Sequence, residues 1–494
     1  MRRGIVRPAG QPAPQQAGPA SADPAPVPVA GFAPSGPARG SATARSGTAG
    51  SDARDVPVSG AARGGGKAIF EGFDGLRAIA ALLVVLVHSS FTAGFTTRTA
   101  ADGSYASRWG AYTARGEIGV AIFFLISGFL LYRPFAAAHM SGRRPPALGG
   151  YLIRRFARIV PLFWFALVVT VAIGGWHVVH GVPGLLECAF FLQSYRARWA
   201  LQGIDQAWTL DIEVAFYLTL PVWAWLVGRR PRAPERQLRV ELLSLAGLYL
   251  GSVGLHAALA TQHSGWAEAW HGWLPVWWNL FALGMGLAVL STWYADRGRT
   301  PRWAARTGSA TACWLVALIL YWLVSTHLGM SRNPLHGRSV GSDLVEHLFY
   351  GLFALFLIMP AVFVPARRGW VQRLLSCRPM AFLGLVSYGI YLWHQLVIAQ
   401  LVAWTGWRIF QISMIEFIPT VVAVTVLVSG VTYVVVARPF IARSHDWARR
   451  GRERAAGLSP LPADLAAPAG PDQSGGPGQS GGPGQRAAVS PDGR

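Results

Sequence analysis

Ten apolar segments, each close to the length of a membrane span, are the feature that most restricts how this chain can fold. Their approximate cores are residues 75–93, 117–135, 159–179, 209–228, 240–260, 274–292, 310–328, 345–365, 381–402 and 414–437. A helix needs about 20 predominantly apolar residues to cross a bilayer core. Several segments contain Gly or Pro, which membrane helices tolerate. The pattern predicts an all-α, polytopic membrane helix bundle of about ten transmembrane helices.

Composition and charge agree with this class. The chain is 52% hydrophobic and 14% charged, whereas soluble domains average about 25% charged residues. The net charge of +21 would suggest nucleic acid as a partner of a soluble protein. Here the arginines gather in the loops after segments two, four, six, eight and ten, and are sparse in the other loops. Basic loops mark the cytoplasmic side, so we expect a multi-pass protein of the cell membrane with both termini cytoplasmic and no nucleic-acid partner.

The chain is expected to have one folded domain between two flexible tails. Residues 1–66 are rich in Pro, Ala and Gly, and residues 446–494 are polar and repeat Gln-Ser-Gly-Gly-Pro-Gly. Both lack the large apolar residues that offset the entropy cost of ordering, so we predict disorder there. The membrane domain is placed at 67–445. Within it, the third segment has an alternative end near Gly174, and residues 180–207 are expected to form a re-entrant or interfacial piece.

The first segment carries an arginine near its start and a histidine well inside it. Arg77 and His88 are separated by roughly three helical turns, so both lie on nearly one face of a helix. An ionisable side chain in a span is costly unless it faces protein or a wet cavity. Because the pKa of histidine lies near neutrality, His88 is a candidate general base. The alternative is a satisfied histidine packed between helices.

Two further sets of charged residues lie at span ends. Arg155 and Arg158 are neighbours on one helical face and could clamp phosphate oxygens, or simply anchor the span in the cytoplasmic interface. Asp211 and Glu213 open the fourth segment. Glu213 is drawn toward the apolar layer, where it could orient a histidine or hold a substrate hydroxyl. Snorkelling to the interface is the alternative for both carboxylates.

The second and ninth segments contribute small and polar residues. Gly119 and Gly128 permit close backbone approach, and Ser127 can form a hydrogen bond across helices. In the ninth segment, polar side chains recur at helical spacings and end in His394, which is expected to support the cavity rather than react. Candidates for the cavity lining are Asp74, Ser127, Trp208, Ser387, Tyr388, Tyr391 and His394. Three scattered cysteines and no suitably spaced histidines predict no metal site.

These motifs, in this order, resemble the acyltransferase-3 family of integral-membrane O-acyltransferases, which includes glycan O-acetylases and macrolide acyltransferases. The resemblance rests on Arg77 with ten residues before His88, the stretch Gly119 to Phe129, Arg155-x-x-Arg158, Trp208-x-Leu-x-x-Glu213 and Ser387-Tyr-x-x-Tyr-x-x-His394. It implies acyl-CoA, usually acetyl-CoA, as a co-substrate presented from the cytoplasm. It also implies that His88 is the catalytic histidine with Arg77 as its partner, and that Arg155 and Arg158 meet the donor phosphates. No bound cofactor is implied.

One motif departs from the family pattern. Many members have glutamate in a Ser-Tyr-x-x-x-Glu-x-Pro-Phe stretch near the end of the last span, and this chain has Ala437 at that position. Some relatives also carry a hydrolase-like domain after the spans. The polar tail of this chain is not expected to form one, so a second transfer step is expected to need another protein.

The functional hypothesis is an O-acyltransferase that moves an acyl group from acyl-CoA to a hydroxyl of a carbohydrate or glycosylated natural product. His88 would act as the base, and Arg77 and Glu213 would complete the catalytic set. Two alternatives remain: a proton-coupled secondary transporter, since buried His, Arg and Glu also suit a carrier, and a non-catalytic component of a glycan export complex.

Overall fold

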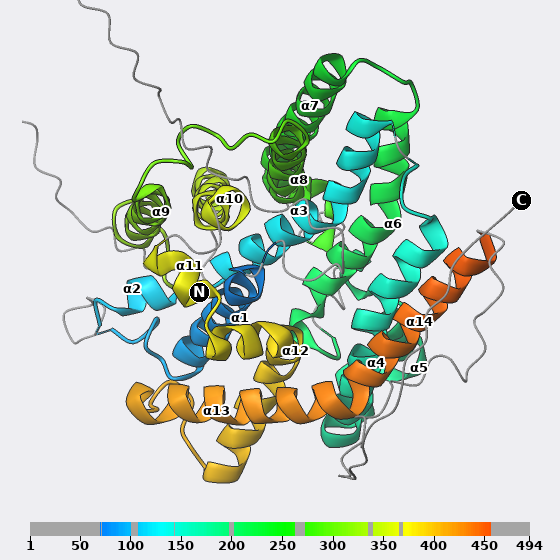
Figure 1. The fold of residues 1–494 in the computed structure, drawn as a ribbon. Helices are drawn as coiled ribbons and strands as arrows, with labels where there is room; N and C mark the ends of the chain where they lie inside the picture. Colours follow the sequence, from blue (N-terminus) through cyan, green and yellow to red (C-terminus); the bar gives the residue numbers. More distant parts are fainter. Residues whose placement is uncertain are drawn as a thin grey trace, which may run out of the picture. The chain divides into compact units, whose positions relative to one another are not determined.

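The computed structural model describes residues 70, 72–99, 107–142, 144–196, 202–261, 272–333, 339–364 and 369–455. The predicted tail 1–66 lies outside these residues, as does the part of the second tail beyond residue 455. Figure 1 shows the described chain as a set of helices. Their bounds are α1 Gly72–Thr92, α2 Gly110–Thr113, α3 Ile118–Ser141, α4 Leu148–Gly174, α5 Gly181–Ala189, α6 Trp208–Gly228, α7 Pro234–Ala260, α8 Leu274–Asp296, α9 Ser309–Thr326, α10 Val340–Phe363, α11 Trp370–Leu375, α12 Arg378–Thr405, α13 Met414–Thr432 and α14 Arg438–Ala455.

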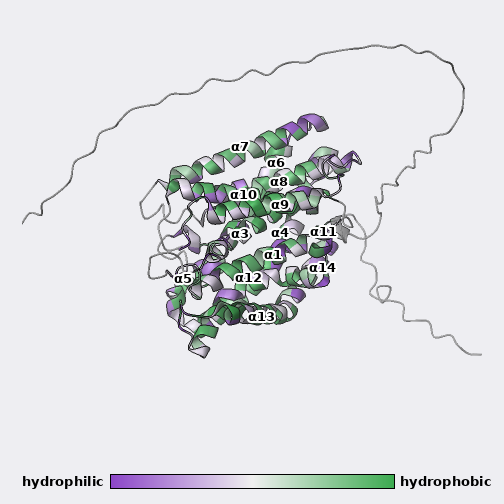
Figure 2. Ribbon diagram, turned by 90° about the vertical axis from the view of Figure 1, so that its left-hand side faces the viewer, coloured by the Kyte–Doolittle hydropathy of each residue, from purple (hydrophilic) through white to green (hydrophobic). Residues whose placement is uncertain are grey.

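Ten stretches of the described chain are long and apolar enough to cross a membrane, as predicted. They consist of α1, α2 with α3, α4, η4 (Asp205–Ala207) with α6, α7, α8, α9, α10, α12, and α13 continued into α14. The protein is therefore a helical, multi-pass membrane protein. Large apolar side chains such as Trp225, Leu250 and Ile415 are exposed, and Figure 2 shows apolar residues along the outer helices. Such side chains suit a surface in contact with lipid.

The third predicted segment differs most from the structure. Helix α4 begins at Leu148 and ends at Gly174, where Gly175 takes a positive φ of 77°. The alternative end near Gly174 is therefore correct, and the predicted core at 159–179 began too late and ended too late. It began too late because Arg154, Arg155 and Arg158 interrupt the apolar run without interrupting the helix, since arginine is a good helix former. Arg155 and Arg158 consequently lie inside α4. The predicted core ended too late because the apolar composition continues past Gly175, where the helix stops.

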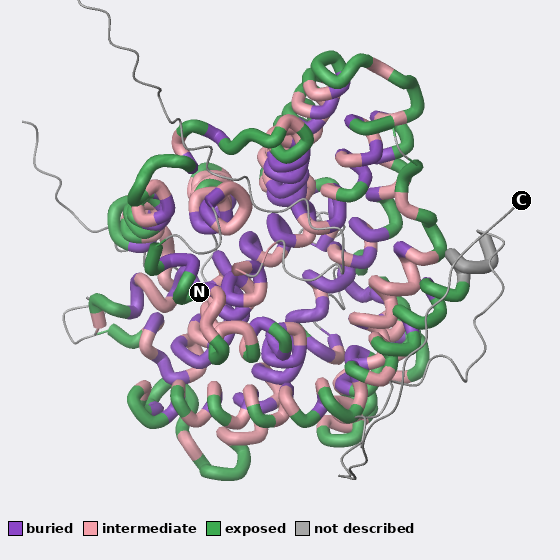
Figure 3. The backbone as a smooth tube through the Cα atoms, viewed as in Figure 1, coloured by how far each residue is buried: buried purple, intermediate pink, exposed green. Residues whose placement is uncertain are grey.

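Helix α1 lies among several partners from distant parts of the chain. It packs against α3, α12 and α13, while α3 packs along α8, and α7 packs against α8 on the side away from α1. Figure 3 shows the consequence: α3 and α8 are largely buried and α7 is largely exposed. A residue on α1 therefore has protein on more than one side, which is what an ionisable group in a span requires.

Glycines permit the close contacts of α3. A Cβ added at Gly119 would lie 2.3 Å from the carbonyl oxygen of Ala80 on α1, and one at Gly128 would lie 2.3 Å from that of Phe281 on α8. These distances confirm the predicted close approach at both glycines. The two glycines let α3 pack closely between α1 and α8.

The segment predicted to be re-entrant or interfacial packs on the middle of α4. The indole nitrogen of Trp164 donates to the carbonyl oxygen of Ala189 at 2.9 Å, and the rings of Phe163 and Phe191 stack with centroids 4.6 Å apart. Trp164 lies about 24 Å along α4 from its first residue at 1.5 Å per residue. The segment therefore reaches the level of the spans rather than extending away from them.

The last span continues beyond the predicted domain end at residue 445. Met414–Arg450 contains 37 residues, or about 55 Å of helix at 1.5 Å per residue, whereas a bilayer core is about 30 Å thick. The turns of α14 therefore extend out of the bilayer core. A π-helical turn at Tyr433–Ala437 connects α13 to α14. Ala437, at the position of the glutamate that many family members carry, therefore lies where the helix is locally widened.

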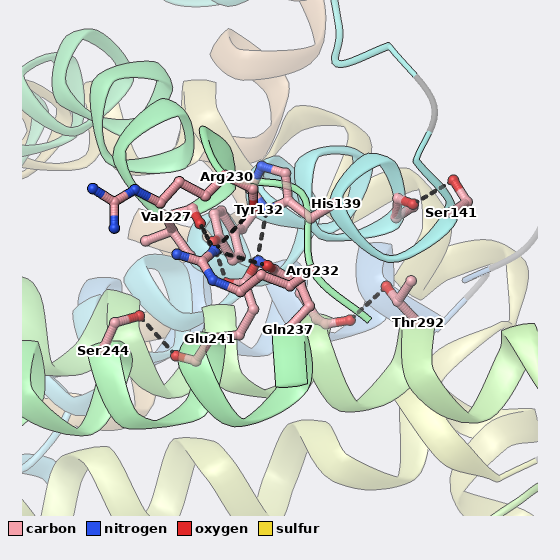
Figure 4. Close-up of polar contacts among 12 residues, drawn as sticks. Tyr132, His139, Ser141, Val227, Arg230, Arg232, Gln237, Glu241, Ser244 and Thr292 are labelled. Atoms are coloured by element: carbon pink, nitrogen blue, oxygen red, sulfur yellow. Dashed lines mark hydrogen bonds and ion pairs between the residues drawn. The ribbon is translucent and has the colours of Figure 1, made fainter. Parts of the chain in front are cut away.

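A buried polar cluster joins α3 to the start of α7 (Figure 4). Glu241, fully buried, accepts hydrogen bonds from Tyr132 Oη at 2.5 Å, from His139 Nδ1 at 2.6 Å and from Gln237 Nε2 at 3.1 Å. Arg232 donates to the Gln237 side chain at 3.1 Å. A buried carboxylate needs such donors, so the cluster fixes α7 to α3.

Candidate active site

A cavity of about 80 Å³ lies among α1, α3, α4, α6 and α12. Its walls are mostly apolar, and its polar groups come from all five helices. The lining residues are Arg77, Val120, Phe123, Phe124, Ile126, Ser127, Leu130, Leu131, Arg155, Arg158, Ile159, Thr209, Leu210, Glu213, Tyr217, Ser387, Tyr388 and Tyr391. A mostly apolar pocket with a few convergent polar groups is the usual form of a small-molecule site.

Three arginines line this cavity. Arg77 forms an ion pair with Asp74 at 2.9 Å, and its charge is opposed by the nearby charges of Arg158 and Arg155. Within the described chain, Arg155 and Arg158 form no hydrogen bond or ion pair with a protein acceptor. Guanidinium groups that lack protein partners in a concave site are suited to bind an anionic ligand.

Glu213 is the carboxylate of the cavity. Its Oε1 accepts a hydrogen bond from Ser127 Oγ at 2.9 Å and one from Tyr217 Oη at 2.5 Å. The bond from Ser127 confirms the predicted contact across helices. Glu213 has no hydrogen bond to His88 in the described structure, so orientation of that histidine is not its geometric role here. Asp211 is only 1% exposed and is bound by the backbone and hydroxyl of Ser194, so it does not snorkel to the interface.

His88 faces helix α12 and meets His394. His394 Nε2 lies 3.2 Å from His88 Nδ1, and the two ring centroids are 5.0 Å apart. His88 Nδ1 also lies 2.9 Å from the carbonyl oxygen of Val84, and His394 Nδ1 lies 2.7 Å from that of Tyr391. His88 is partly exposed, whereas His394 is fully buried.

The two histidines do not line the cavity, and Tyr391 stands between the cavity and His394. Its ring lies 5.9 Å from that of His394 and 5.9 Å from that of Phe123. The Tyr391 hydroxyl donates to the carbonyl oxygen of Gln206 at 3.0 Å and lies 2.6 Å from Thr209 Oγ1. The end of the cavity next to the histidines is therefore formed by Tyr391 and Thr209.

The structure brings together most of the residues that the sequence singled out. Arg77, Ser127, Arg155, Arg158, Glu213, Ser387, Tyr388 and Tyr391 share the cavity. Asp74 lies beside it as the partner of Arg77. Trp208 does not line the cavity, and its ring packs 5.4 Å from that of Trp277.

Two polar lining residues were missed. Thr209 and Tyr217 are four residues before and after Glu213, so the three lie on one face of α6. The spacing was present in the sequence. It was not used because Thr and Tyr are common in spans and do not indicate chemistry without a cavity.

The described residues contain no group of three or more His, Cys, Asp or Glu side chains that could hold a metal ion. The polar groups of the cavity are instead three guanidiniums, one carboxylate and several hydroxyls. This set can bind an anion at one end and hydroxyl or carbonyl groups along its length. A titratable histidine stands just beyond the other end.

Comparison with known proteins finds peptidoglycan O-acetyltransferases among the relatives of this chain. The chain spans about half the length of the first curated relatives it matches. A peptidoglycan O-acetyltransferase, OatA, of Listeria monocytogenes is 24% identical over 66% of this chain and 49% of its own length. The exopolysaccharide production protein ExoZ of Rhizobium meliloti is 27% identical over 72% of this chain and 97% of its own. The acyltransferase MdmB of Streptomyces mycarofaciens is 32% identical over 32% of this chain and 40% of its own.

No solved structure matches the chain. The family model of the acyltransferase-3 acyltransferase domain matches residues 70–436, which include every helix that lines the cavity. The chain therefore belongs to the acyltransferase-3 family.

Proposed function

We propose that this protein transfers an acyl group, most simply acetyl, from acyl-CoA to a hydroxyl of a carbohydrate or a glycosylated small molecule. The single observation that carries the proposal is a pair of guanidiniums, Arg155 and Arg158, that lack a protein acceptor within the described chain and line a cavity whose Tyr391 ring contacts His394, the neighbour of His88. The family supplies the reaction class. Two relatives, a peptidoglycan O-acetyltransferase and an exopolysaccharide production protein, support a carbohydrate acceptor.

The donor would bind with its phosphates at Arg155 and Arg158 and with Arg77 nearby. Charge-assisted hydrogen bonds from arginine to phosphate are short and often bidentate. Arg77 and His88 are separated by about 16 Å along α1, so an acyl group held near His88 requires a long, flexible arm between it and the phosphates. Acyl-CoA has such an arm, and the apolar walls of the cavity suit its passage.

The arginine distribution favours a donor from the cytoplasm. The loops after the even-numbered spans carry most of the loop arginines, and basic loops remain on the cytoplasmic side. Arg155 and Arg158 lie near the start of α4, directly after one of these loops. The proposal therefore places both termini and the phosphate end of the cavity on the cytoplasmic side of the cell membrane.

His88 would act as the general base. It takes the proton of the acceptor hydroxyl while that oxygen attacks the thioester carbonyl carbon. The new C–O ester bond forms, the C–S bond breaks, and the imidazolium returns the proton to the departing thiolate. General-base catalysis of this kind contributes about 10²–10⁴ in rate.

The test uses the purified full-length protein in lipid nanodiscs with acetyl-CoA and a panel of glycan and glycoside acceptors. The expected result is release of free thiol with acetylation of an acceptor, detected by mass spectrometry. His88→Ala should lower turnover by at least about 10² while the protein remains folded in the disc. His327→Ala is the matched control, because His327 is exposed at the end of α9.

Two results would contradict the proposal. Absence of acetyl-CoA turnover with every acceptor, together with retained binding of glycan-export partners, would favour the scaffold alternative. Near-normal turnover by His88→Ala would remove His88 from the mechanism. Thiol release without any acceptor, in an amount equal to the enzyme, would instead indicate an acyl-enzyme intermediate.

A further inference from the structure

A chain of hydrogen-bonding groups next to His88 has no role in the reaction as proposed above. It runs from the Tyr391 carbonyl to His394 Nδ1, from His394 Nε2 to His88 Nδ1, and from His88 Nδ1 to the Val84 carbonyl. Each imidazole therefore presents a nitrogen to a backbone carbonyl. A carbonyl oxygen only accepts hydrogen bonds, so the nitrogen that faces it must carry the proton.

These constraints fix both tautomers. His394 Nδ1 faces a carbonyl and carries the proton, which leaves a lone pair on His394 Nε2 in the neutral ring. His88 Nδ1 faces the Val84 carbonyl and that lone pair, so it is the donor to both. His88 Nε2 is then left with the lone pair, and this nitrogen is the basic one. Which ring nitrogen is protonated is set by the partner of the other nitrogen.

We propose that His394 is a positioning residue that holds His88 in the Nδ1–H tautomer, so that His88 Nε2 is presented to the substrates as the base. This inference rests on the proposed function. After His88 takes a proton, the lone pair of His394 Nε2 still accepts from Nδ1–H and stabilises the imidazolium. The arrangement does the work that a carboxylate does behind the histidine of a Ser-His-Asp triad, with a neutral ring as the acceptor.

The surroundings keep His394 in place. It is fully buried, and its partner carbonyl on Tyr391 is also bound by Gln206 Nε2 at 3.2 Å. Gln206 binds the adjacent Leu392 carbonyl at 2.7 Å, so η4 fixes the turn of α12 that carries both groups. The carboxylates whose charges act on His88 are Glu117 and Asp205. Within the described chain neither imidazole is hydrogen-bonded to a carboxylate, so His394 is the side chain that contacts the His88 ring nitrogen.

The experiment compares two variants of the full-length protein in nanodiscs. In His394→Gln, the amide oxygen can stand where Nε2 stood and accept from His88 Nδ1–H. In His394→Leu only the Val84 carbonyl remains beside His88 Nδ1, and the side-chain acceptor that stabilises the His88 imidazolium is lost. The expected result is a kcat within about tenfold of wild type for His394→Gln and a loss of roughly 10²–10⁴ for His394→Leu. KM for acetyl-CoA should stay unchanged in both, because the cavity arginines are untouched.

The second measurement is the tautomer itself. Solid-state NMR of ¹⁵N-histidine protein, with His88 assigned by its absence from His88→Ala, should show Nδ1 protonated in wild type and in His394→Gln. In His394→Leu the fraction with Nε2 protonated should rise. A purely structural role for His394 would not restore the tautomer in the Gln variant alone.

The outcomes separate this inference from the proposed function. A His394→Leu protein with near wild-type kcat, or wild-type His88 with its proton on Nε2, overturns the inference even if His88→Ala is inactive. An active His88→Ala protein overturns both. If His394→Leu fails to fold, the tautomer in wild type and the activity of His394→Gln still decide the matter.

Discussion

Arg155 and Arg158 are the charged side chains in this molecule whose environment points most directly to a ligand. They lie on the membrane-spanning helix α4 and line a cavity. Neither has a protein acceptor within the described chain. Arg77 adds a third positive charge that repels both. Like charges held together in a cavity raise the free energy of the empty site, and an anion relieves this repulsion.

Loss of either cavity arginine should weaken donor binding. We expect Arg155→Gln and Arg158→Gln each to raise KM for acyl-CoA about tenfold, since a hydrogen bond to a charged group contributes about 1.5–3 kcal/mol, with little change in kcat. Steady-state kinetics on acetyl-CoA measure this. Arg236→Gln on the exposed side of α7 is the control and should behave as wild type. Unchanged KM values in all three would remove the arginines from donor binding.

The Cys188 thiol gives a residue-level test of the packing of α5 against α4. Burial, with the nearby carboxylates of Asp211 and Glu187, raises the pKa of this thiol from 9.0 to about 12. The thiolate is the reactive form, so at pH 7.5 Cys188 should remain protonated and react at least about tenfold more slowly than the half-buried Cys377 with N-ethylmaleimide. The reaction should accelerate as the pH rises toward 12.

Peptide mass spectrometry of timed samples measures both cysteines in one experiment. Denatured protein, in which both thiols are exposed, is the control and should give similar rates. Equal rates in the folded protein would mean that the segment over α4 opens readily.

Helix α6 shows how one element organises the site. Thr209, Glu213 and Tyr217 lie on its cavity face, and Val214 and Leu218 lie on another face against the apolar side chains of α4. Helix α4 is divided in the same way, with Arg155 on its cavity face. The two helices therefore form a wall between the cavity, with its few polar groups, and an apolar surface.

The contact between α3 and α8 predicts a strong dependence on Gly128. In Gly128→Ala the new methyl would meet the Phe281 backbone, which cannot move as a side chain can. We expect a loss of about 1–3 kcal/mol of stability, the usual cost of overpacking. Gly247→Ala on α7 is the matched control, because its methyl would meet nothing within 4 Å, and helix propensity gains up to about 1 kcal/mol there.

Thermal unfolding in detergent compares the two variants. The expected order of melting temperature is Gly247→Ala at or above wild type and Gly128→Ala below it. Equal melting temperatures for both variants would show that α3 and α8 are not closely packed at this point.

At the scale of the complete fold, the site depends on helices from widely separated parts of the chain. The cavity needs α1, α3 and α4 from the first half and α12 from near the end. The histidine pair joins the first span to the ninth. Such a site forms only when the complete bundle is assembled, so its sidedness follows from the topology of all ten spans.

Orientation can be measured with single cysteines in a variant in which Cys188, Cys313 and Cys377 are replaced by alanine. Thr300→Cys lies in the loop after α8, which carries several arginines, and His327→Cys lies at the end of α9. We expect a membrane-impermeant maleimide to label His327→Cys in intact cells and Thr300→Cys only after permeabilisation, because basic loops stay on the cytoplasmic side. The opposite labelling would reverse the proposed orientation and place the arginine end of the cavity outside.

The spans could be located from the chain alone because apolar length is a local property. Each predicted core overlaps a described helix. The third began too late because three arginines make the first turns of α4 polar, and it ended too late because the helix stops at Gly174. Helical spacing likewise placed Arg77 and His88 on one face of α1, and the family motifs selected most of the cavity residues. These conclusions need only the geometry of a single helix.

The partners of those residues could not be obtained in this way, because they depend on which helices lie side by side and at what distance. Nothing in the spacing of α6 shows that Glu213 meets Ser127 of α3 rather than a histidine. The contact of His394 with His88, more than 300 positions apart, likewise required the close packing of α1 and α12. Side-chain direction follows from one helix, but a hydrogen bond needs two groups within about 3 Å, and only the packed bundle sets that distance.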